Sequence, residues 1–142
     1  MVNFSLCCCG LAGSREADVI ALGALDGLAD PGSRGFDIDV GMQQPARLFV
    51  VHKDGVLSAY RNSCPHTGAP LEWQPDQFLD LDNSFIQCAI HGALFRVEDG
   101  FCLRGPCTGS SLQSLPVLVR DGQIMLDLSL QELASEFIEP VR

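Results

Sequence analysis

The sequence predicts an all-β fold of short antiparallel strands, and two observations support this prediction. Asp-Gly pairs at 54–55, 99–100 and 121–122 separate short apolar runs. An Asp-Gly pair in this position is a strong hairpin signal, because glycine accepts a positive φ. The flanking runs are also rich in β-branched and aromatic side chains, which favour strands. Short strands joined by such turns form either a sandwich or a small barrel.

The predicted elements follow one another along the chain. Residues 16–29 predict a strand followed by a helical turn, with a break at Asp30, Pro31 and Gly32. Strands are then expected at residues 47–52, 56–60, 85–88, 93–97, 117–120 and 123–128. The last segment, residues 129–138, predicts an amphipathic helix because its apolar residues have helical spacing. These residues are Leu130, Leu133, Ala134 and Phe137.

Composition limits the function classes. The chain has 142 residues, of which 46% are apolar, so it can form one domain with a core. Eighteen acidic residues against nine basic ones give a net charge of −9. This charge argues against nucleic-acid binding, because phosphates require Lys and Arg, and it suits docking on a basic partner. No apolar run approaches the roughly 18 residues that a membrane helix needs, so no membrane association is expected.

Seven cysteines indicate a reducing compartment. An odd number argues against a secreted disulfide scaffold, so we expect a cytoplasmic protein. Residues 1–15, with Cys7, Cys8 and Cys9, show no period and are expected to form a poorly ordered N-terminus. Cys102 and Cys107 flank a Gly-Pro turn and either form a redox-sensitive disulfide or pack as small hydrophobes, and we expect packing.

Two of the three histidines stand beside cysteines, in the motifs Cys64-Pro-His66 and Cys88-Ala-Ile-His91. The two motifs are separated by 21 residues, and each is followed by a glycine-containing turn. Each motif presents one thiolate and one imidazole. Thiolates suit an iron–sulfur cluster, and two imidazoles on one iron raise its reduction potential. Two Cys and two His also satisfy tetrahedral zinc, so a structural zinc site is the alternative.

The stretches NSCPHTGAPL, residues 62–71, and QCAIHGALF, residues 87–95, resemble the ligand loops of the Rieske [2Fe–2S] domain. The resemblance covers roughly residues 46–128. It implies an antiparallel Rieske-type β-sandwich with a two-loop cluster-binding subdomain, and one [2Fe–2S] cluster per chain. It also implies that Cys64 and Cys88 bind the inner iron, and that His66 and His91 bind the outer iron near solvent. The Rieske domain is then expected over residues 16–128, followed by a C-terminal helix and tail over 129–142.

Two departures from the cytochrome bc type place the chain in the low-potential, ferredoxin-type branch of that family. Rieske proteins of the cytochrome bc type carry a disulfide between the loops, at positions that are Ala69 and Ile90 here. They also carry a serine hydroxyl where this chain has Ala93. Fewer donors to the cluster imply a lower potential.

The spacer between the motifs is longer than in small ferredoxins, and an exposed loop is expected around residues 75–82. A Gly-Pro turn within residues 104–117 is expected to close the cluster site.

The resemblance implies a soluble Rieske-type ferredoxin that carries one electron from a reductase to a terminal oxygenase or similar acceptor, without catalysing a reaction itself. Alternatives are an accessory Rieske subunit and a redox-sensing or interaction module. The large subunit of a ring-hydroxylating oxygenase needs two further histidines and a carboxylate, whereas only His52 remains. Small nitrite-reductase subunits often lack the ligands that are present here.

The remaining candidate residues have structural interpretations. His52 is expected to be an exposed strand-end residue, and Tyr60 is expected to fill the core. Trp73 and Pro75 are expected to cover the ligand loops or line a loop surface, and a partner-docking role is the alternative. A group of acidic residues near the loops forms either a solvated surface or a patch that steers a basic partner. These residues are Asp76, Asp80, Asp82, Glu98 and Asp99.

Overall fold

A computed structural model describes residues 19–136, apart from positions 42, 66, 67, 90, 91 and 107. The strands of this part form three antiparallel sheets. The first sheet has the order β10 (Val117–Arg120), β11 (Gln123–Leu126), β2 (Ile20–Ala24). The second has the order β3 (Gly32–Ile38), β4 (Ala46–Lys53), β5 (Val56–Arg61), β9 (Ser114–Leu115). The third has the order β6 (Phe85–Gln87), β7 (Leu94–Arg96), β8 (Cys102–Arg104).

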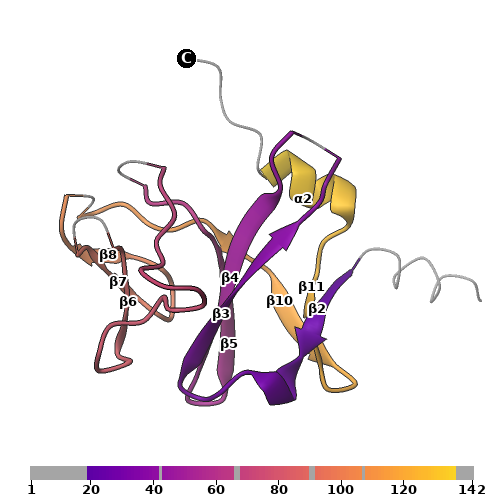
Figure 1. Ribbon diagram of the computed structural model, residues 1–142, viewed down its shortest axis with the longest axis horizontal. Helices are drawn as coiled ribbons and strands as arrows, with labels where there is room; N and C mark the ends of the chain where they lie inside the picture. Colours follow the sequence, from indigo (N-terminus) through magenta and orange to yellow (C-terminus); the bar gives the residue numbers. More distant parts are fainter. Residues whose placement is uncertain (1–18, 42, 66–67, 90–91, 107, 137–142) are drawn as a thin grey trace, which may run out of the picture.

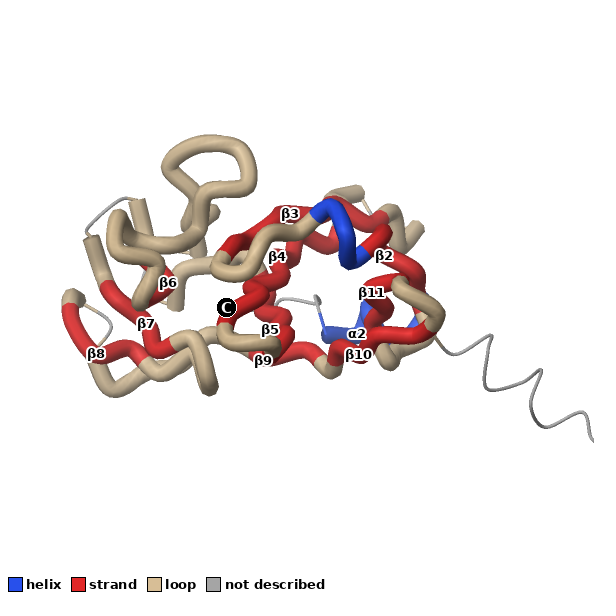
Figure 2. Tube along the Cα trace, turned by 90° about the horizontal axis from the view of Figure 1, so that it is seen from below, coloured by secondary structure: helices blue, strands red, loops and turns tan. Residues whose placement is uncertain are grey.

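The three sheets divide the molecule into a larger and a smaller part. The first two sheets and the helix α2 (Leu130–Glu136) form the larger part. The small sheet β6–β7–β8 and the long loops around it form the other end (Figures 1 and 2). A short 3-10 helix, η1 (Leu25–Gly27), follows β2. Cys64 and Cys88 both belong to the core beside this small sheet, together with Ile86 and Phe95.

Strand β4 lies between two cores. Leu48 and Val50 belong to the core of the larger part, which also contains residues of β11 and α2. Phe49 and Val51 belong to the second core, beside the small sheet. All four side chains are fully buried. Because both faces of β4 are buried, the strand is a continuous apolar run and not an alternating one.

The predicted strands at 47–52, 56–60, 85–88, 93–97, 117–120 and 123–128 correspond to β4, β5, β6, β7, β10 and β11, with small differences at their ends. The predicted strand and helical turn before residue 30 correspond to β2 and η1. The strands β3, β8 and β9 were not predicted. β3 contains two glycines and charged residues, and β9 has only two residues, so neither shows a strand pattern in the sequence.

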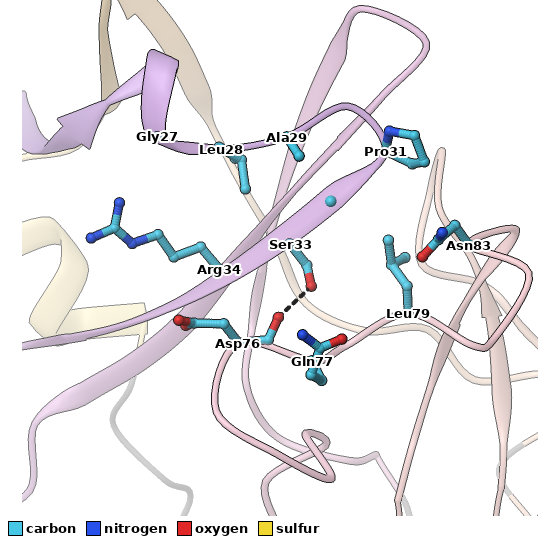
Figure 3. Close-up of a pocket in the computed structure, with 11 residues that line it drawn as sticks. Gly27, Leu28, Ala29, Pro31, Ser33, Arg34, Asp76, Gln77, Leu79 and Asn83 are labelled. Carbon is cyan, nitrogen blue, oxygen red and sulfur yellow. Dashed lines mark hydrogen bonds between the residues drawn. The ribbon is translucent and has the colours of Figure 1, made fainter.

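An exposed loop was expected at residues 75–82. This expectation is wrong for the middle of the segment, which packs against β3. The Asp76 carboxylate accepts the Gly35 N–H at 2.8 Å. The Ser33 hydroxyl donates to the Asp76 carbonyl oxygen at 2.7 Å (Figure 3) and accepts the Phe78 N–H at 3.2 Å. Phe78 is fully buried, and its ring stacks on Phe49 with the centroids 4.3 Å apart. The long spacer thus attaches the small sheet to the second sheet.

The helix α2 begins with a capping box. The Ser129 hydroxyl accepts the Glu132 N–H at 3.1 Å, and the Glu132 carboxylate accepts the Ser129 N–H at 2.9 Å. Leu133 is fully buried, as predicted, but Leu130 is 52% exposed, so the predicted apolar stripe is wrong there. Phe137 and the predicted N-terminal segment 1–15 lie outside the described residues. Within residues 19–136 as described, no helix has the length and apolarity that a membrane crossing requires.

Tyr60 fills the core, as the sequence predicted. It is 1% exposed, and its hydroxyl donates to the Val97 carbonyl oxygen at 2.7 Å. Burial raises the pKa of Tyr60 from 10.0 to about 12, and the charges of Asp99 and Glu98 act in the same direction. Because the folded state holds this proton more tightly than the unfolded state, the resulting stabilisation is complete below pH 10 and is lost as the pH rises toward 12.

We therefore expect the free energy of unfolding to fall between pH 10 and about pH 12. Tyr60→Phe removes this titration, and it leaves the Val97 carbonyl without the phenol donor. At neutral pH it should cost about 1–3 kcal/mol, and the alkaline fall should become shallower. Urea unfolding of both proteins at neutral pH and across the alkaline range measures both effects. An equally steep alkaline fall in Tyr60→Phe would assign the titration to other groups.

Candidate metal centre

The two cysteine loops share one backbone hydrogen-bond pattern. The Cys64 N–H donates to the carbonyl oxygen five residues on at 2.8 Å, and the Cys64 carbonyl accepts the Gly68 N–H at 2.7 Å. Cys88 repeats the pattern, with 2.9 Å to the residue five positions on and 2.9 Å from the Gly92 N–H. The two glycines have φ of 78° and 66°, a conformation that glycine adopts at little cost. The loops are therefore two equivalent turns, each beginning at a cysteine.

Both cysteines are buried. Cys64 is 3% exposed and Cys88 is 1% exposed, and both belong to the core cluster that contains Phe95 and Leu71. A dry apolar surrounding controls the access of solvent to a metal centre and lowers the local dielectric constant. The site thus combines two thiol groups with protection from water.

Asn62 makes three hydrogen bonds that hold the segment after the first loop, and this segment in turn bonds to the second loop. It is 8% exposed, and its backbone N–H donates to the Arg47 carbonyl oxygen at 2.9 Å. Its side-chain oxygen accepts the Leu71 N–H at 2.8 Å, and its side-chain amide donates to Glu72 at 3.0 Å. The Leu71 carbonyl then accepts the Ala89 N–H at 2.9 Å, next to Cys88 in the chain. The sequence analysis missed this residue, because nothing in the stretch NSCPH distinguishes a buried asparagine from an exposed one.

The segment around Gly105 closes over the second loop. Gly105 has φ of 110°, and a Cβ added there would lie 2.8 Å from the Ala93 Cβ and 2.9 Å from the Ala93 Cα. Only glycine permits this approach. Ala93 itself is 1% exposed. This contact agrees with the Gly-Pro turn that was expected to close the site.

The described residues fit a cluster held by soft thiolates. Two buried cysteines begin equivalent turns, a glycine contact seals one of them, and the histidines follow the cysteines by two and three positions in the sequence. His66 and His91 lie outside the described residues, as do Ile90 and Cys107. The donor set of two thiolates and two imidazoles is the one that a Rieske-type cluster uses.

Two other sequence predictions can be compared with the structure. Cys102 is fully buried, as expected for packing, and its thiol donates to the Arg104 carbonyl oxygen at 3.3 Å. The prediction for His52 is wrong, because its side chain is only 16% exposed. Its Nε2 lies 3.7 Å from the Asp30 carboxylate, and its Nδ1 lies 3.4 Å from the Leu28 carbonyl oxygen.

Three of the five acidic candidates accept hydrogen bonds within the protein, Asp80 and Asp99 in local turns and Asp76 from a distant strand. The Asp80 carboxylate accepts the N–H groups of residues 84 and 85, as Asp76 accepts that of residue 35. Asp99 contacts Arg96 at 2.6 Å, and this guanidinium together with the N–H of residue 101 lowers the pKa of Asp99 to about 2. Glu98 lines a pocket that residues of the β4–β5 turn also line. Asp82 is exposed.

Two pockets border the spacer between the motifs. The larger, of about 550 Å³, lies between residues 27–34 and 76–83 and is not lined by either cysteine (Figure 3). The smaller, of about 230 Å³, is lined by Cys88 and its neighbours Ala89 and Gly92, and by Trp73 and Leu81 from the spacer. Of these two pockets, the smaller therefore adjoins the second cysteine loop.

Comparison with known proteins decides the family. Residues 31–120 match the family model of the Rieske [2Fe-2S] domain. The chain belongs to the Rieske [2Fe–2S] domain family. It is 32% identical over 85 residues to the 3-phenylpropionate/cinnamic acid dioxygenase ferredoxin subunit of Photorhabdus laumondii, covering 60% of this chain and 76% of that subunit. The predicted family and cofactor are thereby confirmed, and this Rieske protein holds one [2Fe–2S] cluster per chain.

Solved structures confirm the predicted Rieske fold. A structure described as the complex of reduced oxygenase and oxidized ferredoxin in carbazole 1,9a-dioxygenase contains a chain that is 25% identical. It aligns with a TM-score of 0.62 over 78% of this chain and 93% of that one. The ferredoxin of carbazole 1,9a-dioxygenase from Nocardioides aromaticivorans IC177 is 24% identical, with a TM-score of 0.61 over 77% and 96% of the two chains. The all-β architecture of the described residues is therefore that of a Rieske ferredoxin.

Proposed function

We propose that this chain is the ferredoxin component of an oxygenase system. It accepts one electron at a time from a reductase and passes it to a terminal oxygenase. The similarity to a dioxygenase ferredoxin subunit and to a ferredoxin of carbazole 1,9a-dioxygenase supports this proposal. In this role the protein is an electron carrier and not the enzyme that converts the substrate. The cytoplasm suits it, because a reducing compartment keeps its cysteines as thiols.

The repeated turn around Cys64 and Cys88 is the observation that carries the proposal. Cys64 and Cys88 supply two thiolates, and His66 and His91 supply two imidazoles from the same loops. When bound, the cluster supplies one-electron redox chemistry at a potential set by its ligands and their surroundings. Asn62 positions Leu71, whose carbonyl oxygen accepts the Ala89 N–H of the second loop, and burial keeps water from the thiolates.

The reduction potential should lie in the lower part of the Rieske range, which spans about −150 to +300 mV. Ala93 follows Gly92 in the second cysteine loop, and it has no hydroxyl to donate to the cluster. The close contact of Ala93 with Gly105 leaves little space for a larger side chain there. A potentiometric titration measures the value directly.

An EPR spectrum of the dithionite-reduced protein, purified without oxygen, tests the proposal. We expect a rhombic signal with an average g value below that of the free electron, and two iron atoms per chain. The protein should then be reduced by NADH in the presence of a flavin-containing reductase. A colourless, EPR-silent protein that contains zinc would refute both the electron-carrier function and the ligand assignment.

A further inference from the structure

An apolar surface lies beside the second cysteine loop. Leu81 is 90% exposed, more than any other large hydrophobic side chain in the described part of the chain, and Trp73 is 44% exposed. Both line the pocket of about 230 Å³ that Cys88 also lines. Single exposed hydrophobic residues are common, but here two share one pocket with a proposed cluster ligand. Such a grouping indicates an interaction surface.

The turn that carries Leu81 is fixed by hydrogen bonds. The Asp80 carboxylate accepts the Ser84 N–H at 2.9 Å and the Phe85 N–H at 3.2 Å. The Asp80 carbonyl oxygen accepts the Asn83 N–H at 2.9 Å. Leu81 is therefore presented on a preformed turn. A preformed apolar contact loses little conformational entropy when a partner binds.

The segment that carries this surface is negatively charged. Residues 72–83 contain four acidic side chains and no Lys or Arg. The carboxylates of Glu72, Asp76 and Asp80 accept hydrogen bonds from the chain itself. Asp82 is exposed, and no described residue donates a hydrogen bond to its carboxylate. This charge attracts a surface that bears Lys and Arg.

We propose that Trp73, Leu81 and Asp82 form the docking surface for the electron-accepting protein. That protein presents an apolar patch, ringed by Lys and Arg side chains, at its own redox centre. The inference rests on the function proposed above and states which side of the cluster site the acceptor covers. The apolar pair supplies the dry centre of the contact, and the acidic segment supplies attraction at a distance.

Cytochrome c is a suitable probe, because lysines surround its exposed haem edge. Reduced, cluster-loaded protein, freed of dithionite, is mixed with ferricytochrome c, and one electron passes from the protein to the ferric haem. We expect Leu81→Gln to lower the second-order rate constant roughly five- to tenfold. The matched control, Leu130→Gln, replaces a leucine that is 52% exposed on α2 and should keep the wild-type rate.

Variants that change a charge test the role of Asp82 in the docking surface. Asp82→Lys should lower the rate constant severalfold at low salt, and high salt should remove most of the difference. Asp127→Lys makes the same change of net charge at an exposed position between β11 and α2, and it should have a much smaller effect. Iron content and the rate of oxidation by ferricyanide, a small acceptor, confirm that Leu81→Gln keeps an intact, reactive cluster.

Three outcomes would overturn the inference. If the wild type reduces neither cytochrome c nor ferricyanide, the electron-carrier function and the docking surface are both refuted. If the wild type reduces both, but Leu81→Gln and Asp82→Lys match their controls, only the docking surface is refuted. If light scattering shows a wild-type dimer that Leu81→Gln dissociates without changing the rate, the surface binds a second copy of the chain instead.

Discussion

Cys64→Ser and Cys88→Ser should each lose the bound iron, whereas Cys102→Ser should keep it. All three cysteines are buried, with exposed fractions of 3%, 1% and 0%. Only the first two begin the repeated turn, while the Cys102 thiol donates to a backbone carbonyl oxygen at 3.3 Å, as a serine hydroxyl can also do. Hydroxyl oxygen is a poor ligand for a cluster that prefers soft thiolate.

The expected result is at least a roughly tenfold loss of iron per chain in each ligand variant after aerobic purification. Iron analysis and visible absorbance measure it, and far-ultraviolet circular dichroism shows whether the β-sheets persist. Cys102→Ser is the matched control, because it makes the same atomic change at an equally buried site. Loss of iron in Cys102→Ser with iron retained in Cys88→Ser would mean that the ligands are misassigned.

The parts of this protein that the sequence predicts are those that depend on neighbouring residues. The hairpin at Asp54–Gly55 follows from a local turn signal, and β4 and β5 lie on either side of it as expected. The cysteine motifs are equally local, because each loop closes within five residues of its cysteine. For this reason the fold class, the cofactor and the two strands before the first loop could be predicted.

The missed features depend on contacts between distant residues. β3 is defined by its pairing with β4, and Asp76 attaches the spacer to Gly35 across 41 residues. His52 was expected to be exposed because the sequence does not show that Asp30 folds back toward it. Trp73 and Leu81 likewise share a pocket with Cys88 only because the spacer returns to the second loop. No periodicity or motif in the sequence predicts these contacts between distant residues.

The role of Asn62 also depends on contacts that its neighbours in the sequence do not show. A single substitution at this position should affect both stability and cluster retention. The Asn62 side-chain oxygen accepts the Leu71 N–H, and the Leu71 carbonyl oxygen accepts the N–H of Ala89, next to Cys88. Asn62→Leu keeps a similar volume but leaves the Leu71 N–H without its acceptor in a buried position. We expect a loss of about 1–3 kcal/mol in the free energy of unfolding.

The same variant should release iron faster, because Leu71, whose carbonyl oxygen accepts the Ala89 N–H of the second loop, loses the hydrogen bond that positions it. The measurement is the decay of visible absorbance in excess chelator, and second-neighbour substitutions at metal sites typically weaken metal retention by roughly 10–100-fold. Glu72→Gln is the control, because its side-chain oxygen still accepts the Asn62 amide, and it should remain close to the wild type in both measurements. If Asn62→Leu loses stability but releases iron at the wild-type rate, Asn62 supports the fold alone, and retention of the cluster does not depend on its bond to Leu71.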